Sequence, residues 1–278
     1  MKREKESGWV RRESRTRPSP RPSSPLSEMI EMSGSSAYTD QQTSTLAAAA
    51  EKFSQSGDRG KEAAARFELG RYLFQLQRGG AAFEQLRRAA EIFEQDELAT
   101  PAAQAFLGSG HALTVDGRQE ESLLWFDRAI GQFGQAEDQA GRLEASAAKL
   151  ETLADLNRWS DTDLSNQLIA ATEHTDSLRL LTFRLVAFRY RTQAQLAAGD
   201  PMGSLASAAQ AADVAGRLGD RRTEATFRLV LAHNHRILKD FDSAAEEYEQ
   251  VLDLVRGLPG AADLEEEAAK GLGATLDD

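Results

Sequence analysis

The sequence repeats with a period of about forty residues, and this repeat constrains the fold more than any other feature. Phenylalanine recurs at Phe53, Phe93 and Phe133, and a glutamine follows each of them two positions later. Self-similarity at a fixed period of this length is typical of proteins built from stacked supersecondary units. In such proteins no single unit buries its own apolar face, so neighbouring units have to stack on one another. We therefore expect the three phenylalanines in the core.

A second pattern has the same period and indicates helices. A small residue is followed four positions later by an apolar residue, which is usually large, and three positions after that by a small or apolar one. Copies of this pattern lie at Ala82-Leu86-Ala89, Ser122-Phe126-Ala129, Ser204-Ala208-Ala211 and Ala244-Tyr248-Val251. Spacings of four and three place side chains on one face of a helix. An apolar stretch with a small residue, such as Leu69-Gly70, precedes these copies, so the pattern predicts two antiparallel helices that cross closely at the small residues.

The rest of the chain agrees with an all-helical fold. From Asp40 onward only Pro101, Pro201 and Pro259 interrupt the sequence, and each lies where we expect a helix boundary. No alternating β-branched run or Asn-Gly turn predicts a strand. We predict an all-α fold, an α-solenoid of about five antiparallel helix hairpins with flanking helices, over residues 38–278. An irregular helical bundle is the alternative.

Residues 1–37 are predicted to form a disordered basic tail. The first 28 residues carry eight Lys or Arg and four Glu, a net charge of +4, and hold four of the seven prolines. So little apolar surface cannot offset the entropy of ordering the segment. Such a tail could tether nucleic acid through counterion release, although the charge of −15 on the remaining residues makes nucleic acid an unfavourable partner. The other interpretation is an unstructured leader, translated from a start codon assigned too far upstream.

The helical pattern resembles the tetratricopeptide repeat (TPR). The segments that match the motif are Leu69-Gly70, Leu73 and Ala82-Leu86-Ala89. The resemblance covers residues 40–278, and the period near forty resembles the longer variant found in kinesin light chains and in many bacterial regulators. The third unit, residues 143–176, matches least. Arg66 and Arg228 stand where the motif has an aromatic residue early in the first helix.

The resemblance implies a non-enzymatic scaffold with a protein or peptide partner. TPR arrays bind their partners in the concave groove that is lined by the first helix of each pair. The TPR clamp for chaperone tails needs a Lys and an Asn on a first helix, and Phe67 and Arg71 stand at those positions, so we expect no chaperone binding. The alternative is a peptide-responsive sensor, in which a ligand changes the pitch of the superhelix.

Basic residues gather in two of the expected first helices, over residues 179–191 and 221–236. If these helices stack side by side, the basic residues form one cationic patch in the C-terminal half of the groove. Such a patch would suit an acidic peptide or a C-terminal carboxylate. The candidate binding residues are Arg71, His111, Arg184, Arg189, Gln193, Arg228, His233 and Arg236. The alternative is a solvated helix face whose arginines pair with nearby glutamates.

Motifs for catalysis, cofactors or metals are not found in the sequence. The chain has no cysteine, which excludes disulfides, thiolate zinc sites and a thiol nucleophile. His233 and His235 are two positions apart, so they point to opposite sides of a helix and cannot share a metal ion. No apolar run is long enough to span a membrane. We therefore expect a cytoplasmic protein without catalytic, cofactor-binding or metal-binding residues.

Overall fold

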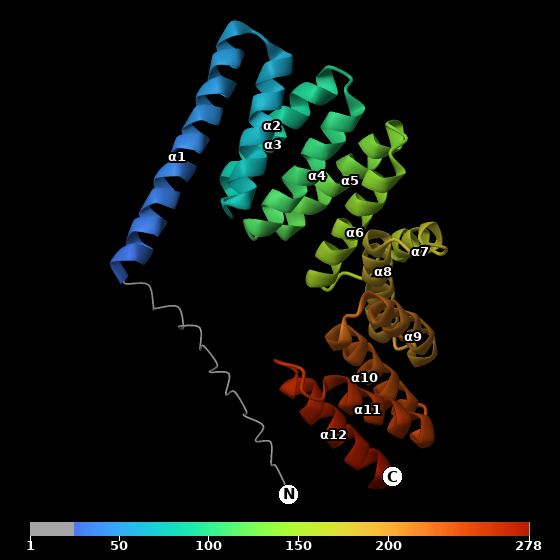
Figure 1. Ribbon diagram of the computed structural model, residues 1–278. Helices are drawn as coiled ribbons and strands as arrows, with labels where there is room; N and C mark the ends of the chain where they lie inside the picture. The colour runs from blue at the N-terminus through green and yellow to red at the C-terminus, as the bar shows by residue number, and fades with distance from the viewer. Residues whose placement is uncertain (1–24, 278) are drawn as a thin grey trace, which may run out of the picture. The chain divides into compact units, whose positions relative to one another are not determined.

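The computed structural model describes the backbone of residues 25–277 and the side chains of residues 40–277. The chain divides into two units, residues 1–44 and residues 45–278. Twelve helices and no strand occur in the described range (Figure 1). The helices are α1 (Pro25–Ser56), α2 (Arg59–Gln75), α3 (Gly79–Gln95), α4 (Ala99–Val115), α5 (Gln119–Gln135), α6 (Gln139–Asp155), α7 (Thr162–Ala171), α8 (Leu178–Ala197), α9 (Pro201–Leu218), α10 (Arg221–Ile237), α11 (Phe241–Val255) and α12 (Ala262–Asp277).

Helix α1 begins inside the segment that the sequence predicts to be a tail. It starts at Pro25 and continues without a break through residue 38, the predicted start of the repeat domain. Proline is well suited to the first position of a helix, and no other proline follows before Pro101, so nothing in the backbone chemistry ends this helix early. Residues 1–24 lie outside the described residues, and their disorder stays a prediction.

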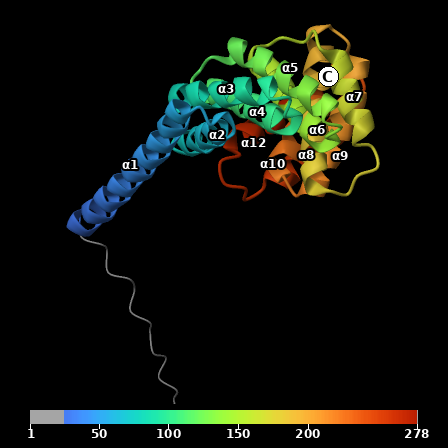
Figure 2. The same cartoon turned by 90° about the horizontal axis from the view of Figure 1, so that it is seen from above.

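Consecutive helices of residues 45–278 pack against one another. Five hairpins, α2–α3, α4–α5, α6–α7, α8–α9 and α10–α11, follow in order, and α12 comes after the fifth as a single helix. The second helix of each hairpin also packs against the first helix of the next, so the units stack (Figures 1 and 2). The predicted all-α solenoid of helix hairpins is confirmed.

The turns between helices recur every twenty residues, which is half of the period seen in the sequence. A residue with positive φ ends most helices, at Gly57, Gln77, Glu97, Gly117, Glu137, Asn157, Gly199, Gly219 and Lys239. The next N–H then donates to the carbonyl five residues earlier, as from Arg78 to Leu73 (3.0 Å) and from Leu98 to Phe93 (2.9 Å). This hydrogen bond closes the C-terminus of a helix. Outside the third hairpin, each forty-residue period therefore consists of two helix–turn units of nearly equal length.

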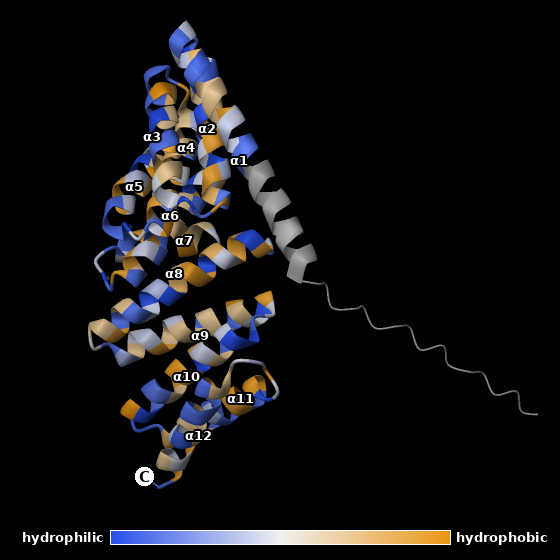
Figure 3. Ribbon diagram, turned by 90° about the vertical axis from the view of Figure 1, so that its left-hand side faces the viewer, coloured by the Kyte–Doolittle hydropathy of each residue, from blue (hydrophilic) through white to orange (hydrophobic). Residues whose placement is uncertain are grey.

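The close crossing within a hairpin lies where the sequence pattern predicts it. A Cβ atom at Gly70 would lie 2.5 Å from Cγ of Leu86, and one at Gly110 would lie 2.4 Å from Cε1 of Phe126. Leu86 and Phe126 are both buried, so the space that each glycine leaves is filled by a large side chain of the partner helix. Figure 3 shows apolar and polar residues alternating around the helices, as expected when one face of each helix is buried.

The three phenylalanines of the repeat are not buried equally. Phe93 and Phe133 belong to the core, whereas Phe53 is only partly buried. Phe53 lies near the end of α1, which no hairpin precedes among the described residues. Its ring is covered in part by the ammonium group of Lys61, which lies 5.7 Å from the ring centroid.

The third hairpin, α6–α7, is the least regular because α7 is only ten residues long. Polar contacts fix the connection between its helices. The ammonium group of Lys149 lies 2.9 Å from a carboxylate oxygen of Asp127 and 2.8 Å from one of Asp161. The hydroxyl of Tyr190, a buried residue of α8, accepts a hydrogen bond from the N–H of Asp161 and donates one to the carbonyl of Arg158. These contacts hold together the unit that matches the TPR motif least.

The first helices of the hairpins approach one another more closely than the second helices do. Cα atoms of α4 lie within 8 Å of α2 and α6, and the same holds for α6 with α8 and for α10 with α12. Among the described residues, α3 and α5, α5 and α7, and α9 and α11 are not joined in this way. We call the surface of α2, α4, α6, α8, α10 and α12 the first-helix face. It is interrupted once, because the described residues of α8 and α10 have no Cα pair within 8 Å.

The helix crossing predicts opposite effects for alanine at two glycines. Gly110→Ala should lower the free energy of unfolding by about 1–3 kcal/mol, because the ring of Phe126 has to move away from the new Cβ. Gly131→Ala, at an exposed position of α5 with no atom within 4 Å of a Cβ, should raise it by about 0.5–1 kcal/mol through helix propensity alone. Thermal unfolding followed by circular dichroism measures both. Equal stability of Gly110→Ala and wild type would contradict the close crossing.

Candidate functional site

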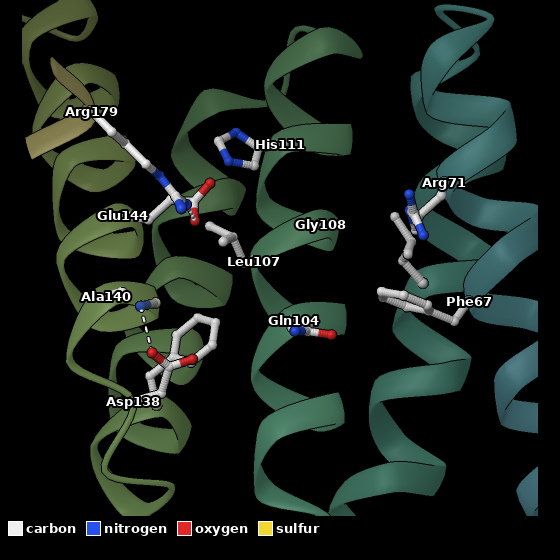
Figure 4. A pocket seen from close by; sticks show the side chains of 13 residues that line it. Phe67, Arg71, Gln104, Leu107, Gly108, His111, Asp138, Ala140, Glu144 and Arg179 are labelled. Carbon is white, nitrogen blue, oxygen red and sulfur yellow. Dashed lines mark hydrogen bonds and ion pairs between the residues drawn. The ribbon is translucent and has the colours of Figure 1, made fainter. Parts of the chain in front are cut away.

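One pocket of the first-helix face lies over α2, α4 and α6 and has a volume of about 500 Å³. Its floor is apolar and includes Phe67, Leu107 and Phe133. Gly141 leaves room beside the ring of Phe133, since a Cβ there would lie 2.3 Å from that ring. Figure 4 shows side chains from these three neighbouring helices turned toward one cavity. A smaller cavity of about 220 Å³ adjoins it and shares Arg71 and His111.

Charged side chains form the rim of this pocket, which we call the N-terminal pocket. Arg71 on α2 is exposed and forms an ion pair with Glu68 at 3.1 Å. Arg179 on α8 reaches across to Glu144 on α6, with 2.5 Å between the nitrogen and the oxygen. Exposed pairs such as Arg71–Glu68 contribute little to stability, so the guanidinium of Arg71 can exchange its partner for a ligand at low cost.

His111 connects the pocket with the core. Its ring lies edge-on to that of Phe126, with the centroids 5.3 Å apart, one residue after the glycine at which the helices cross. Burial lowers the pKa of His111 below its usual value, and the negative charge of Glu144 opposes this shift without reversing it. The imidazole is therefore neutral at pH 7, where it offers a ligand one donor and one acceptor.

A second pocket repeats this arrangement on α10, α11 and α12. It has a volume of about 320 Å³ and is lined by His233, Arg236, Tyr248, Glu267, Lys270, Gly271 and Ala274. The ring of His233 lies edge-on to Tyr248 at 5.7 Å, as His111 does to Phe126. Glu267 lies 3.8 Å from His233, as a glutamate of the following first helix. Burial lowers the pKa of His233, Glu267 raises it, and Arg236 lowers it further. We call this cavity the C-terminal pocket.

The structure thus places four of the predicted binding residues in pockets of the first-helix face. Arg71 and His111 line the N-terminal pocket, and His233 and Arg236 line the C-terminal pocket. The sequence analysis did not single out Glu144, Arg179 or Tyr248 as members of these pockets. The spacing of 33 or 34 residues between each histidine and the glutamate of the next first helix is the signal that could have found Glu144 and Glu267.

Arg189 and Gln193 lie on α8, outside both pockets. Arg189 is exposed, and its positive charge acts on Glu151 of α6. Glu151 lies forty residues after His111, at the equivalent repeat position. Partial desolvation of its carboxyl raises the pKa of Glu151, the positive charge of Arg189 lowers it, and the negative charge of Asp155 raises it further. Gln193 is partly buried one turn further along α8.

The guanidinium groups of Arg184 and Arg228 are bonded to other parts of the protein. The guanidinium of Arg184 donates to the carbonyl of Glu173 at 2.8 Å, in the connection before α8. Arg228 forms ion pairs with Glu224 at 3.0 Å and with Glu247 of α11 at 3.2 Å, so it joins the two helices of one hairpin. Among the described residues, α8 and α10 have no Cα pair within 8 Å, so these two helices lack the close side-by-side stacking from which one cationic patch was expected, and the patch stays a prediction.

The arrangement around Arg228 is a repeated structural contact. Arg66 occupies the equivalent position in the first hairpin, where it bonds to Glu62 at 2.8 Å and to Gln85 of α3 at 3.0 Å. Each of these residues lies 162 positions before its counterpart in the fifth hairpin. An arginine thus replaces the aromatic residue of the motif in both hairpins and connects their helices through a polar contact.

The histidine pair of α10 has a structural explanation. His235 contacts Asp240 at 3.0 Å across the turn to α11, and Asn234 is buried and donates to the hydroxyl of Ser204. His233 alone reaches a pocket. Over the residues that the structure describes, no group of three or more His, Asp or Glu side chains could hold a metal ion. No helix in the same range is both long and apolar enough to cross a membrane.

Comparisons with known proteins establish the fold. No family model and no curated protein matches the sequence. Among solved structures, a kinesin-light-chain-type protein of Podosopora anserina with nearly identical TPR-like repeats is 15% identical, has a TM-score of 0.54, and covers 71% of this chain and 97% of its own. The apo form of RapI is 14% identical, has a TM-score of 0.54, and covers 84% of this chain and 90% of its own. The chain has the TPR-like helical repeat fold, as the motifs predicted.

The lowered pKa of His111 predicts a loss of stability on acidification. In the unfolded chain a histidine takes up its proton near pH 6.5, whereas the folded protein resists this protonation. Below that pH the unfolded state binds more protons, so the free energy of unfolding falls as the pH falls. We expect this fall, between about pH 7.5 and about pH 5.5, to be smaller in His111→Gln than in wild type.

Urea unfolding at a series of pH values measures this difference. His174→Gln serves as the control, because His174 is exposed in the connection between α7 and α8. The charged residues that line the N-terminal pocket, Arg71, Asp138, Glu144 and Arg179, are unchanged in all variants, so only the coupling of Glu144 to position 111 differs between them. A pH dependence of His111→Gln identical to that of wild type would show that His111 is not desolvated.

Proposed function

We propose that this chain, which has the TPR-like fold, is a non-enzymatic cytoplasmic scaffold that binds a peptide or protein segment along its first-helix face. The observation that carries the proposal is the N-terminal pocket, which joins an apolar floor to a charged rim across three consecutive first helices. Ligand sites are typically concave and apolar with a few placed polar groups. The closer approach of the first helices supports a groove on this face.

The residues of the N-terminal pocket support a specific mode of binding. An apolar side chain of the peptide enters between Phe67 and Leu107, and burying it contributes about 1.5–3 kcal/mol. Gln104 and His111 supply hydrogen bonds to the peptide backbone. Arg71 pairs with an acidic side chain or carboxylate in place of Glu68, which favours an acidic partner.

For the basic C-terminal half of the groove, we propose fewer contact residues than the sequence predicts. Arg184 and Arg228 are left out, since their guanidinium groups are bonded to Glu173 and to Glu224 and Glu247. The proposed contact residues are Arg71, His111, Arg189, Gln193, His233 and Arg236.

A peptide-responsive sensor is the second candidate. The missing contact between α8 and α10 favours it, because a junction without first-helix packing can change its angle more easily than the others. Small-angle scattering of the chain with and without a bound peptide separates the two functions. A change in the radius of gyration supports the sensor, and an unchanged value supports a static scaffold. Tethering of nucleic acid by the basic tail depends on residues 1–24, which lie outside the described residues.

Selection of random peptides against the full chain tests the proposed function. Ala140→Trp places an indole in the N-terminal pocket at an exposed position of the first turn of α6. Ala81→Trp makes the same change at an exposed position of the first turn of α3, and Ala81 itself lines neither pocket. We expect selected peptides to bind Ala140→Trp with an affinity at least about tenfold lower than that for wild type. Ala81→Trp should bind them normally.

Two results would contradict the proposal. One is that no peptide is enriched on the wild-type chain. The other is that enriched peptides bind Ala140→Trp and wild type equally, which would place the binding surface outside the N-terminal pocket.

A further inference from the structure

The hydroxyl of Tyr248 is a buried polar group without a partner. Tyr248 on α11 is fully buried, and among the described residues no hydrogen-bond partner reaches its hydroxyl. Buried hydroxyl groups in folded proteins are hydrogen-bonded in the large majority of cases, so each exception requires an explanation. Tyr190, the other fully buried tyrosine, follows this rule because its hydroxyl both accepts and donates a hydrogen bond.

The phenol of Tyr248 packs against α12 beside the C-terminal pocket. Tyr248 lines this pocket together with Gly271 of α12. A Cβ atom at position 271 would lie 2.7 Å from the hydroxyl oxygen and 2.4 Å from Cζ. Gly271 therefore lets the backbone of α12 lie directly against the phenol of Tyr248.

The charges around this hydroxyl are mainly positive. Arg236 from α10 and Lys270 from α12 line the pocket, and one carboxylate, that of Glu267, faces them. His233 adds no charge at pH 7 because burial lowers its pKa. Arg236 and Glu267 both act on Tyr248, in opposite directions on the pKa of its hydroxyl, so both lie near enough to influence a group bound there.

We propose that the C-terminal pocket binds a single carboxylate of a peptide ligand, with the Tyr248 hydroxyl donating a hydrogen bond to it and Arg236 and Lys270 balancing its charge. The inference deepens the proposed function and rests on it. Two cations against one carboxylate leave about one positive charge, which matches a monoanion better than a phosphate dianion. The volume of about 320 Å³ accommodates a group the size of one residue.

The site differs in position from the TPR clamp considered in the sequence analysis. The clamp positions correspond to Phe67 and Arg71 on α2, whereas the donor here comes from the second helix α11. The carboxylate could belong to the C-terminus of the peptide or to an Asp or Glu side chain. Both present the same two oxygens, and the experiment below separates them.

Nuclear magnetic resonance titration of the full chain tests the proposal with three small probes. These are acetyl-Ala-Ala with a free C-terminal carboxylate, acetyl-Asp-Ala-amide with only a side-chain carboxylate, and acetyl-Ala-Ala-amide with none. The ring signals of His233, assigned with His233→Gln, report binding in the pocket. We expect at least one acidic probe to bind about tenfold more tightly than the amide. Whichever acidic probe binds more tightly identifies the source of the carboxylate.

Tyr248→Phe removes the proposed donor and leaves the ring in place. We expect about tenfold weaker binding of the acidic probe, with an unchanged or raised melting temperature, because the lost hydroxyl has no partner in the free protein. Tyr190→Phe is the matched control. It should lower the melting temperature, since it removes two hydrogen bonds, and leave probe binding unchanged. Lys270→Met, at an exposed position, should also weaken the acidic probe and does not disturb the core.

Three outcomes would overturn the proposal. They are equal binding of acidic and neutral probes, no shift of the His233 signals with any probe, and wild-type affinity in both Tyr248→Phe and Lys270→Met. In each case, peptide binding that is still lost in Ala140→Trp would leave the proposed function intact. Loss of peptide selection on the wild-type chain would instead remove the proposed function itself.

Discussion

In the first two hairpins, the close crossing of the two helices determines both the packing of the core and the geometry of the candidate site. Gly70 and Gly110 lack the atom that would collide with Leu86 and Phe126, so the large side chain of the second helix can fill the space beside the first. The same contact builds the candidate site. His111 follows Gly110 directly, and its ring rests edge-on against Phe126, so the residue that forms the core also holds the residue that faces the pocket.

The sequence was sufficient for the fold because repeat spacing and small residues are local properties of the chain. The twenty-residue half period was missed, since the positive-φ position that ends each helix is held by residues as different as Gly57, Gln77 and Glu97. The pocket residues were predicted only in part. Arg71, His111 and His233 line pockets at the predicted repeat position, and their role in binding stays a prediction. The ion pair of Arg228 with Glu247 was not expected, because Glu247 belongs to the other helix of the hairpin. Repeat register places a residue on a face, but pairing across helices decides whether its charge is available.

The array is irregular at two places, the third hairpin and the junction between the fourth and fifth hairpins. In the third hairpin, polar contacts of Lys149 and Tyr190 hold the short α7 in place. Between the fourth and fifth hairpins, α9 packs against α10 while the first helices α8 and α10 remain apart. The two pockets lie on opposite sides of this junction. A ligand that occupies both pockets would therefore fix the angle between the two segments of the first-helix face.

Hydrogen–deuterium exchange with a selected peptide locates the binding surface of the protein without any substitution. If the peptide binds in the N-terminal pocket, its addition should slow exchange in α2, α4 and α6, whose side chains line this pocket. Exchange in α3 and α5, which contribute only Leu86 and Phe133 to that pocket, should change less. Slower exchange confined to α3 and α5 would contradict the claim that the first-helix face is the binding surface of this protein.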